Sequence, residues 1–193
     1  DVNLDGFLSI TFSAAGNLSP LWFVNGVDIS EDGAALPPPS ALAAAQTRTA
    51  TGLEQLTAEQ LDPYVLVARQ AWKDTGLTAA QEALLDNVEF VVSDLDGIRA
   101  LGLITTPDRI VIDDDGSGFG WNPLIETVVS DRYDLLTVVG HELGHLLGNP
   151  DTDPFSNPGD LMNSILDIGN RNDSRAGVDG FFQNAIDTLL PFD

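Results

Sequence analysis

The sequence predicts an α+β fold in which helices flank a small mixed sheet. Three observations support this prediction: two capped helical patterns precede a group of short strands, a long apolar helix follows them, and an amphipathic helix lies near the end of the chain. The chain has 193 residues, enough to bury a substantial core. We expect an N-terminal segment over residues 1–50 and a more regular α+β domain over residues 51–193.

The N-terminal segment is expected to contain short strands at residues 7–12 and 21–29, followed by a Pro/Ala-rich linker or extended arm over residues 33–50. Its first nine residues follow the opening positions of a calcium-binding loop, but Phe12 stands where that pattern requires an acidic ligand. The stretch is therefore either a vestigial calcium loop or a polar turn that leads into a strand.

The domain is expected to open with two helices. Asp62 before Pro63 is typical of a helix start, and Gly76 of a helix end. Thr78 and Gln81 have the spacing of a capping box, which predicts a second, short helix.

Strands are expected at residues 88–92, 101–105 and 109–113, followed by a Gly/Asp-rich loop over residues 113–118. The last predicted element is an amphipathic helix over residues 181–190.

A longer apolar helix carries the residues with recognisable chemistry. We expect Asp131 to cap it, with Asp134 at the third helical position, and Gly148 and Pro150 to end it after Leu147. This helix contains both histidines of the chain.

The segment His141-Glu142-Leu143-Gly144-His145 has the H-E-x-x-H spacing. Residues four apart lie on one helical face, so both imidazoles can reach a single metal ion. Glu142 is about 100° further round the helix, where it can act on water as a general base without binding the metal.

A third metal ligand is expected shortly after the helix. Gly148 allows a sharp turn, and Asp151 lies at the spacing that returns a carboxylate toward the two imidazoles. Asp153 is a second carboxylate in the same stretch, but it precedes Pro154, which favours an extended backbone that points it away.

The pattern H-E-x-x-H-x-x-G-x-x-D resembles the metzincin metallopeptidases, in the snapalysin-like variant in which Asp replaces the last His. It covers His141, Glu142, His145, Gly148 and Asp151. Met162, the only methionine, resembles the family's Met-turn below the metal. The approach to the helix resembles that of bacterial matrixin-like sequences.

This resemblance implies a zinc-dependent endopeptidase of the metzincin kind that hydrolyses peptide bonds through metal-activated water, with Glu142 as general base. Protein or peptide substrate would lie extended and add a strand to residues 101–105, which are expected to be an edge strand. Its specificity would come from a pocket walled by the helix and by the residues after Met162. A tyrosine ligand after Met162, a second zinc site built from histidines and a cysteine-based latency switch are all missing from the sequence. An Asp from the first fifty residues capping the zinc is one alternative latency device.

The formal charge of −22 disfavours nucleic acid and anionic membranes as partners. Asp113, Asp114 and Asp115 form either a calcium site or a solvated acidic loop. Because Met162 is the sole methionine, the chain is expected to be a processed or excised piece. The protein is expected to be secreted or at the cell surface, and monomeric. Two rival functions are an inactive metal-binding interaction module and a calcium-dependent adhesion module built on residues 1–9.

Overall fold

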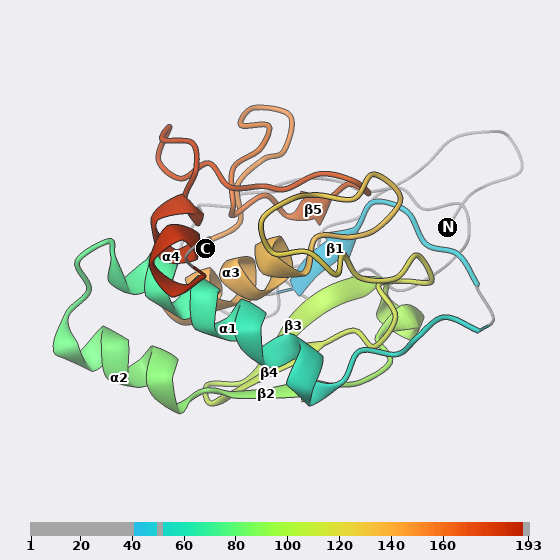
Figure 1. Cartoon of the computed structure of the whole chain (residues 1–193), viewed down its shortest axis with the longest axis horizontal. Coiled ribbons are helices and arrows are strands. Elements are labelled where there is room, and N and C mark those ends of the chain that lie inside the picture. Colours follow the sequence, from blue (N-terminus) through green and yellow to red (C-terminus); the bar gives the residue numbers. More distant parts are fainter. Residues whose placement is uncertain (1–40, 50–51, 191–193) are drawn as a thin grey trace, which may run out of the picture.

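The structure is a computed structural model and describes residues 41–49 and 52–190. The strands expected at residues 7–12 and 21–29 and the calcium-loop pattern of residues 1–9 lie outside these ranges. Within them the fold is α+β, as the sequence predicts, with helices packed on a mixed sheet (Figure 1).

The sheet has five strands in the order β2-β4-β3-β1-β5. Strands β3 and β4 are antiparallel, β2 and β4 are parallel, and β1 lies between β3 and β5 (Figure 1), antiparallel to β3 and parallel to β5. The strands are β1 (Ala41–Ala44), β2 (Glu89–Val92), β3 (Ala100–Thr106), β4 (Arg109–Ile112) and β5 (Ile165–Leu166).

The helices cover the sheet and surround the helix that carries the two histidines. Helix α3 packs against α1 on one side and against β3 on the other, while α4 packs on α1. The Trp72 indole on α1 donates a hydrogen bond of 2.8 Å to the Gly140 carbonyl of α3, which fixes the two helices in register. The helices are α1 (Ala58–Lys73), α2 (Ala79–Asn87), α3 (Leu135–Leu146) and α4 (Gln183–Leu189), with a 3₁₀ turn η1 (Asp96–Ile98).

Two predicted helix starts are wrong. Helix α1 begins at Ala58, before Pro63, because Thr57 and Gln60 form a reciprocal capping box. Helix α3 is capped by Asp134, whose side chain accepts the Thr137 amide, and not by Asp131. The capping box of Thr78 and Gln81 on α2 is confirmed.

The prediction of a linker over residues 33–50 is wrong for Ala41–Ala44, which form β1 inside the sheet. Leu42 and Ala44 lie in the main hydrophobic core, and Ala41 lies in a smaller cluster with Ala100 and Val111. This division follows the alternation of side chains along a strand. Residues of this segment therefore contribute to the core of the domain.

Candidate metal centre

The last two turns of α3 carry the site. His141 and Glu142 are fully buried, and the His145 side chain is only 7% exposed. The two imidazole rings lie 4.5 Å apart between centroids, at 90° to each other, as expected for residues one helical turn apart.

Backbone carbonyls orient both imidazoles. Nδ1 of His141 lies 2.9 Å from the Leu161 carbonyl oxygen, and Nδ1 of His145 lies 2.9 Å from that of Asn149. Because a carbonyl oxygen only accepts, each Nδ1 must carry the proton and donate it. In a neutral ring Nε2 then holds a free lone pair, and burial lowers the pKa of His141, which favours that neutral form. Such outer hydrogen bonds are typical of metal-binding histidines.

The chain reverses after the helix as predicted and brings Asp151 to both rings. Gly148 has φ +85°, a left-handed conformation that favours glycine. Oδ1 of Asp151 lies 3.3 Å from Nε2 of His141 and 3.1 Å from Nε2 of His145. Asp153 is elsewhere: its carboxylate accepts the Phe155 amide and the Ser156 hydroxyl on the exposed loop.

The donor set fits a cation. Both Nε2 atoms and Oδ1 of Asp151 are buried and have no hydrogen-bond partner, although they lie within 4.8 Å of one another. The contacts of Asp151 with the two imidazoles thus have the distances of ion pairs but not the geometry of hydrogen bonds. Three buried electron-pair donors that face one point cost free energy unless a positive charge lies between them. His141, His145 and Asp151 therefore form a group that could hold a metal ion.

Glu142 lies beside this group with one oxygen engaged and one free. Its Oε1 accepts the Leu42 backbone amide at 3.1 Å, while Oε2 is buried without a partner. Burial raises the pKa of this carboxyl to about 8. Gly102 on β3 provides the room: a Cβ there would lie 2.8 Å from Cγ of Glu142.

Met162 is buried against α3 beside Gly144. It is 1% exposed, and a Cβ on Gly144 would come within 2.4 Å of its sulfur. The Met162 amide donates to Asp160 at 2.8 Å, and its carbonyl accepts the Thr152 amide at 2.7 Å. The loop that carries Asp151 is therefore joined directly to the turn at Met162.

The groove beside Glu142 is not open in the structure. Residues 101–105 were expected to be an edge strand, and this is wrong because β3 has β4 on one side and β1 on the other. Sequence reasoning missed Leu42, which is fully buried with its amide on Glu142. An Ala-rich run has weak strand propensity, so it gave little signal of a strand at this place.

The acids Asp113, Asp114 and Asp115, expected to act together, divide between two groups that share Asp113 and contain further members. Asp113 forms one triad with Asp94 and Asp114, and another with Asp96 and Asp115. Asp113 is fully buried and accepts the Leu95 amide at 2.8 Å and the Ser117 amide at 2.7 Å. Burial raises its pKa to about 6. Asp94 and Asp96 were missed because they lie in the loop before β3, near Asp113 only in space.

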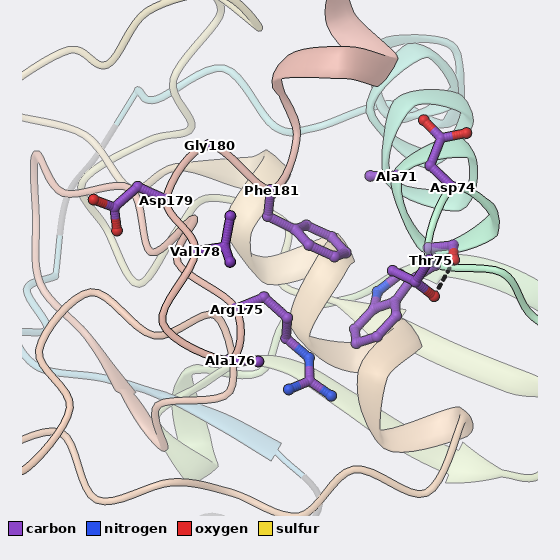
Figure 2. A pocket seen from close by; sticks show the side chains of 10 residues that line it. Ala71, Asp74, Thr75, Arg175, Ala176, Val178, Asp179, Gly180 and Phe181 are labelled. Carbon is purple, nitrogen blue, oxygen red and sulfur yellow. Dashed lines mark hydrogen bonds between the residues drawn. The ribbon is translucent and has the colours of Figure 1, made fainter.

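A separate hollow of about 460 Å³ lies between the end of α1 and the loop of residues 175–181 (Figure 2). None of the four residues of the candidate site lines it. Its Arg175 nevertheless supports the site, because the guanidinium hydrogen-bonds the side chain of Asn149, whose carbonyl orients His145. The guanidinium also lies 5.4 Å from the Trp72 ring centroid.

Comparison with known proteins adds no relative: no protein-family model matches this chain, and no curated protein matches it significantly. In the part of the chain that the structure describes, no helix combines the length and apolar character needed to cross a membrane.

Proposed function

We propose that this chain is a zinc-dependent endopeptidase of the metzincin kind, with His141, His145 and Asp151 as metal ligands and Glu142 as general base. The observation that carries the proposal is the set of three unpartnered lone-pair atoms with the free oxygen of Glu142 beside it. Two imidazoles and one carboxylate are a common ligand set of catalytic zinc, which keeps a further position open. A purely structural zinc site would have no use for Glu142.

Zinc supplies Lewis acidity when bound: it acidifies water and polarises a substrate carbonyl. The protein residues transfer the proton and orient the ligands. Glu142, held in a dry environment, takes a proton from water and passes it to the leaving amine. The carbonyls of Leu161 and Asn149 keep both imidazoles oriented. An extended peptide between β3 and β5 would place its backbone at Glu142.

The test measures metal content and turnover on the same preparations. We expect about one zinc per chain and cleavage of casein or of a mixed peptide library. Glu142→Gln should keep the zinc and lose about 10²–10⁴-fold in turnover, because only the proton transfer is removed. A chain that binds no zinc after zinc loading contradicts the proposal.

A second candidate is a metal-binding interaction module without turnover, in a secreted or surface protein. The position of β1 favours it, because this strand fills the groove and its Leu42 amide engages Glu142. Full zinc occupancy with no hydrolysis of any peptide would select this alternative.

We also propose that the acidic group around Asp113 binds calcium. A calcium ion prefers several oxygen ligands, and two triads that share a buried carboxylate offer them. To test this proposal, the protein is first treated with a chelator, calcium is then added in steps, and thermal unfolding is measured at each step.

A further inference from the structure

Strand β1 lies where an extended substrate of the proposed peptidase is expected. It runs antiparallel to β3 and parallel to β5, with Leu42 opposite Gly102. β5 follows the turn at Met162, so β1 lies between the strand that is expected to bind substrate and the segment that is expected to wall its specificity pocket. Figure 1 shows this short blue strand between β3 and β5.

The contact with Glu142 selects one peptide bond. In the proposed reaction the general base returns its proton to the nitrogen of the leaving amine. The only backbone amide of β1 on Glu142 among the described contacts is that of Leu42, 3.1 Å from Oε1. The Leu42 nitrogen is therefore within reach of the proposed base, and the bond that it shares with Ala41 is the candidate scissile bond.

Side-chain burial agrees with this assignment. Leu42 is fully buried in the main core on the α3 side, while Ala41 is 4% exposed and belongs to the cluster on the opposite side. The residue after the bond is thus large and apolar with its side chain in the core, and the residue before it is small.

Several contacts hold the segment that follows Leu42. Downstream of Leu42, backbone amides donate to both walls of the groove, the Tyr133 hydroxyl exchanges two hydrogen bonds with the Gln46 backbone, and Arg48 lies over the Phe119 ring at 4.2 Å. The wall contacts are Ala43 to Ser164, Ala44 to Arg99 and Ala45 to Leu166, each 3.0 Å. The Arg48 amide donates to Ser117 in the Gly/Asp-rich loop, also at 3.0 Å. Cleavage after Ala41 would therefore leave the downstream half in place.

From this geometry we propose that the chain cuts itself between Ala41 and Leu42, with β1 as an intramolecular substrate. This inference rests on the proposed endopeptidase function. Water adds across the peptide bond: its oxygen joins the Ala41 carbonyl carbon, and the carbon–nitrogen bond breaks. Both protons of the water end on the Leu42 nitrogen, the first by way of Glu142, so the products are a carboxylate on Ala41 and an ammonium group on Leu42.

The experiment uses the full chain of residues 1–193, purified in chelator and then given zinc. Intact mass spectrometry should show loss of residues 1–41, and sequencing should show a new N-terminus at Leu42. The rate constant should stay unchanged over a hundredfold dilution, because the substrate is in the same molecule. Glu142→Gln should remain uncut, and Leu42→Ala should be cut about tenfold more slowly or worse, since the pocket loses most of its apolar contact. Leu66→Ala, an exposed position on α1, is the control and should be cut at the wild-type rate.

A second readout is independent of activity. In metal-free Glu142→Gln, hydrogen exchange should be slow at the amides of residues 42–45, because each donates to a protein acceptor. Exchange at the rate of an unstructured peptide would mean that β1 does not occupy the groove, and would overturn the inference.

The outcomes separate the two proposals. If zinc-loaded protein cuts casein but leaves the Ala41–Leu42 bond intact, the self-cleavage inference is wrong and the endopeptidase stands. A cut elsewhere, or a rate proportional to concentration, also overturns intramolecular cleavage at this bond. Failure to cut any peptide, the chain included, removes both.

Discussion

Arg171 holds Asp134 by two hydrogen bonds at the point where α3 begins, from Nε to Oδ2 at 2.9 Å and from Nη2 to Oδ1 at 2.8 Å. The same carboxylate caps the helix by accepting the amide and the hydroxyl of Thr137. Asp134 is fully buried, and the Arg171 side chain is 10% exposed. The helix that carries the candidate metal ligands is therefore anchored by a buried ion pair.

Arg171→Met should lower the free energy of unfolding by about 3–5 kcal/mol, because it leaves the Asp134 charge buried without its partner. Arg109→Met is the matched control, since Arg109 pairs with Glu89 on the surface at 51% and 58% exposure. We expect that substitution to cost less than about 1 kcal/mol. Urea unfolding of both variants measures the difference, and equal costs would contradict the anchoring role.

Asp151→Ala should weaken zinc binding by far more than Asp153→Ala, by roughly 10–100-fold or above. Asp151 faces both imidazoles, whereas Asp153 is taken up by the amide and the hydroxyl of its own loop. Asp151→His should keep zinc and move the rising limb of the pH–rate profile to lower pH, because a neutral ligand leaves a more positive site. Zinc titration and pH–rate profiles provide the measurement. Loss of the metal in Asp153→Ala alone would show that the ligand assignment is wrong.

The sequence predicted the features of the site that depend on local spacing. The H-E-x-x-H turn of α3 and the reversal at Gly148 follow from helical periodicity and from the left-handed preference of glycine. The capping box of Thr78 and Gln81 is equally local. Each of these features involves residues within a few positions of one another.

The features that the sequence did not predict depend on distant partners. Asp131 and Asp134 are equally good caps by type, and Arg171, 37 residues from Asp134, decides between them. Leu42 contacts Glu142 across 100 residues, and no local pattern in an alanine-rich run indicates that strand. The acidic triads likewise combine two loops that meet only in the folded chain.

Calcium should raise the unfolding midpoint at pH 7 and much less at pH 5. Burial raises the pKa of Asp113 from 3.8 to about 6, so the native chain holds this proton to a higher pH than the unfolded chain does. The stability from that proton is present at low pH and is lost as the pH rises toward 6. Above that range a calcium ion can take the place of the proton. At a calcium concentration of a hundred times its Kd, binding raises the free energy of unfolding by about 2.7 kcal/mol.

Thermal melts at both pH values, in chelator and in calcium with zinc held constant, measure this effect. Magnesium should substitute poorly, because it demands octahedral geometry and loses water reluctantly. Asp94→Asn should reduce the calcium effect, and Asp131→Asn, exposed and outside both triads, should not. An unchanged midpoint in calcium at pH 7 would remove this site.

Gly102→Ala should reduce turnover while leaving zinc in place. A Cβ at this position would lie 2.8 Å from Cγ and 3.0 Å from Oε1 of Glu142, and 2.9 Å from Cγ1 of Val138. These distances are too short, so Glu142 has to move, whereas His141 and His145 have no such conflict with Gly102. A displacement of about 1 Å at a general base can cost on the order of a hundredfold in kcat.

Gly97→Ala in η1 is the control, because no atom lies within 4 Å of its added Cβ. Zinc content and kcat on a peptide substrate are measured for both variants. Full turnover in Gly102→Ala would show that the precise position of Glu142 does not matter, and loss of zinc would show that the substitution disturbs the ligands rather than the base.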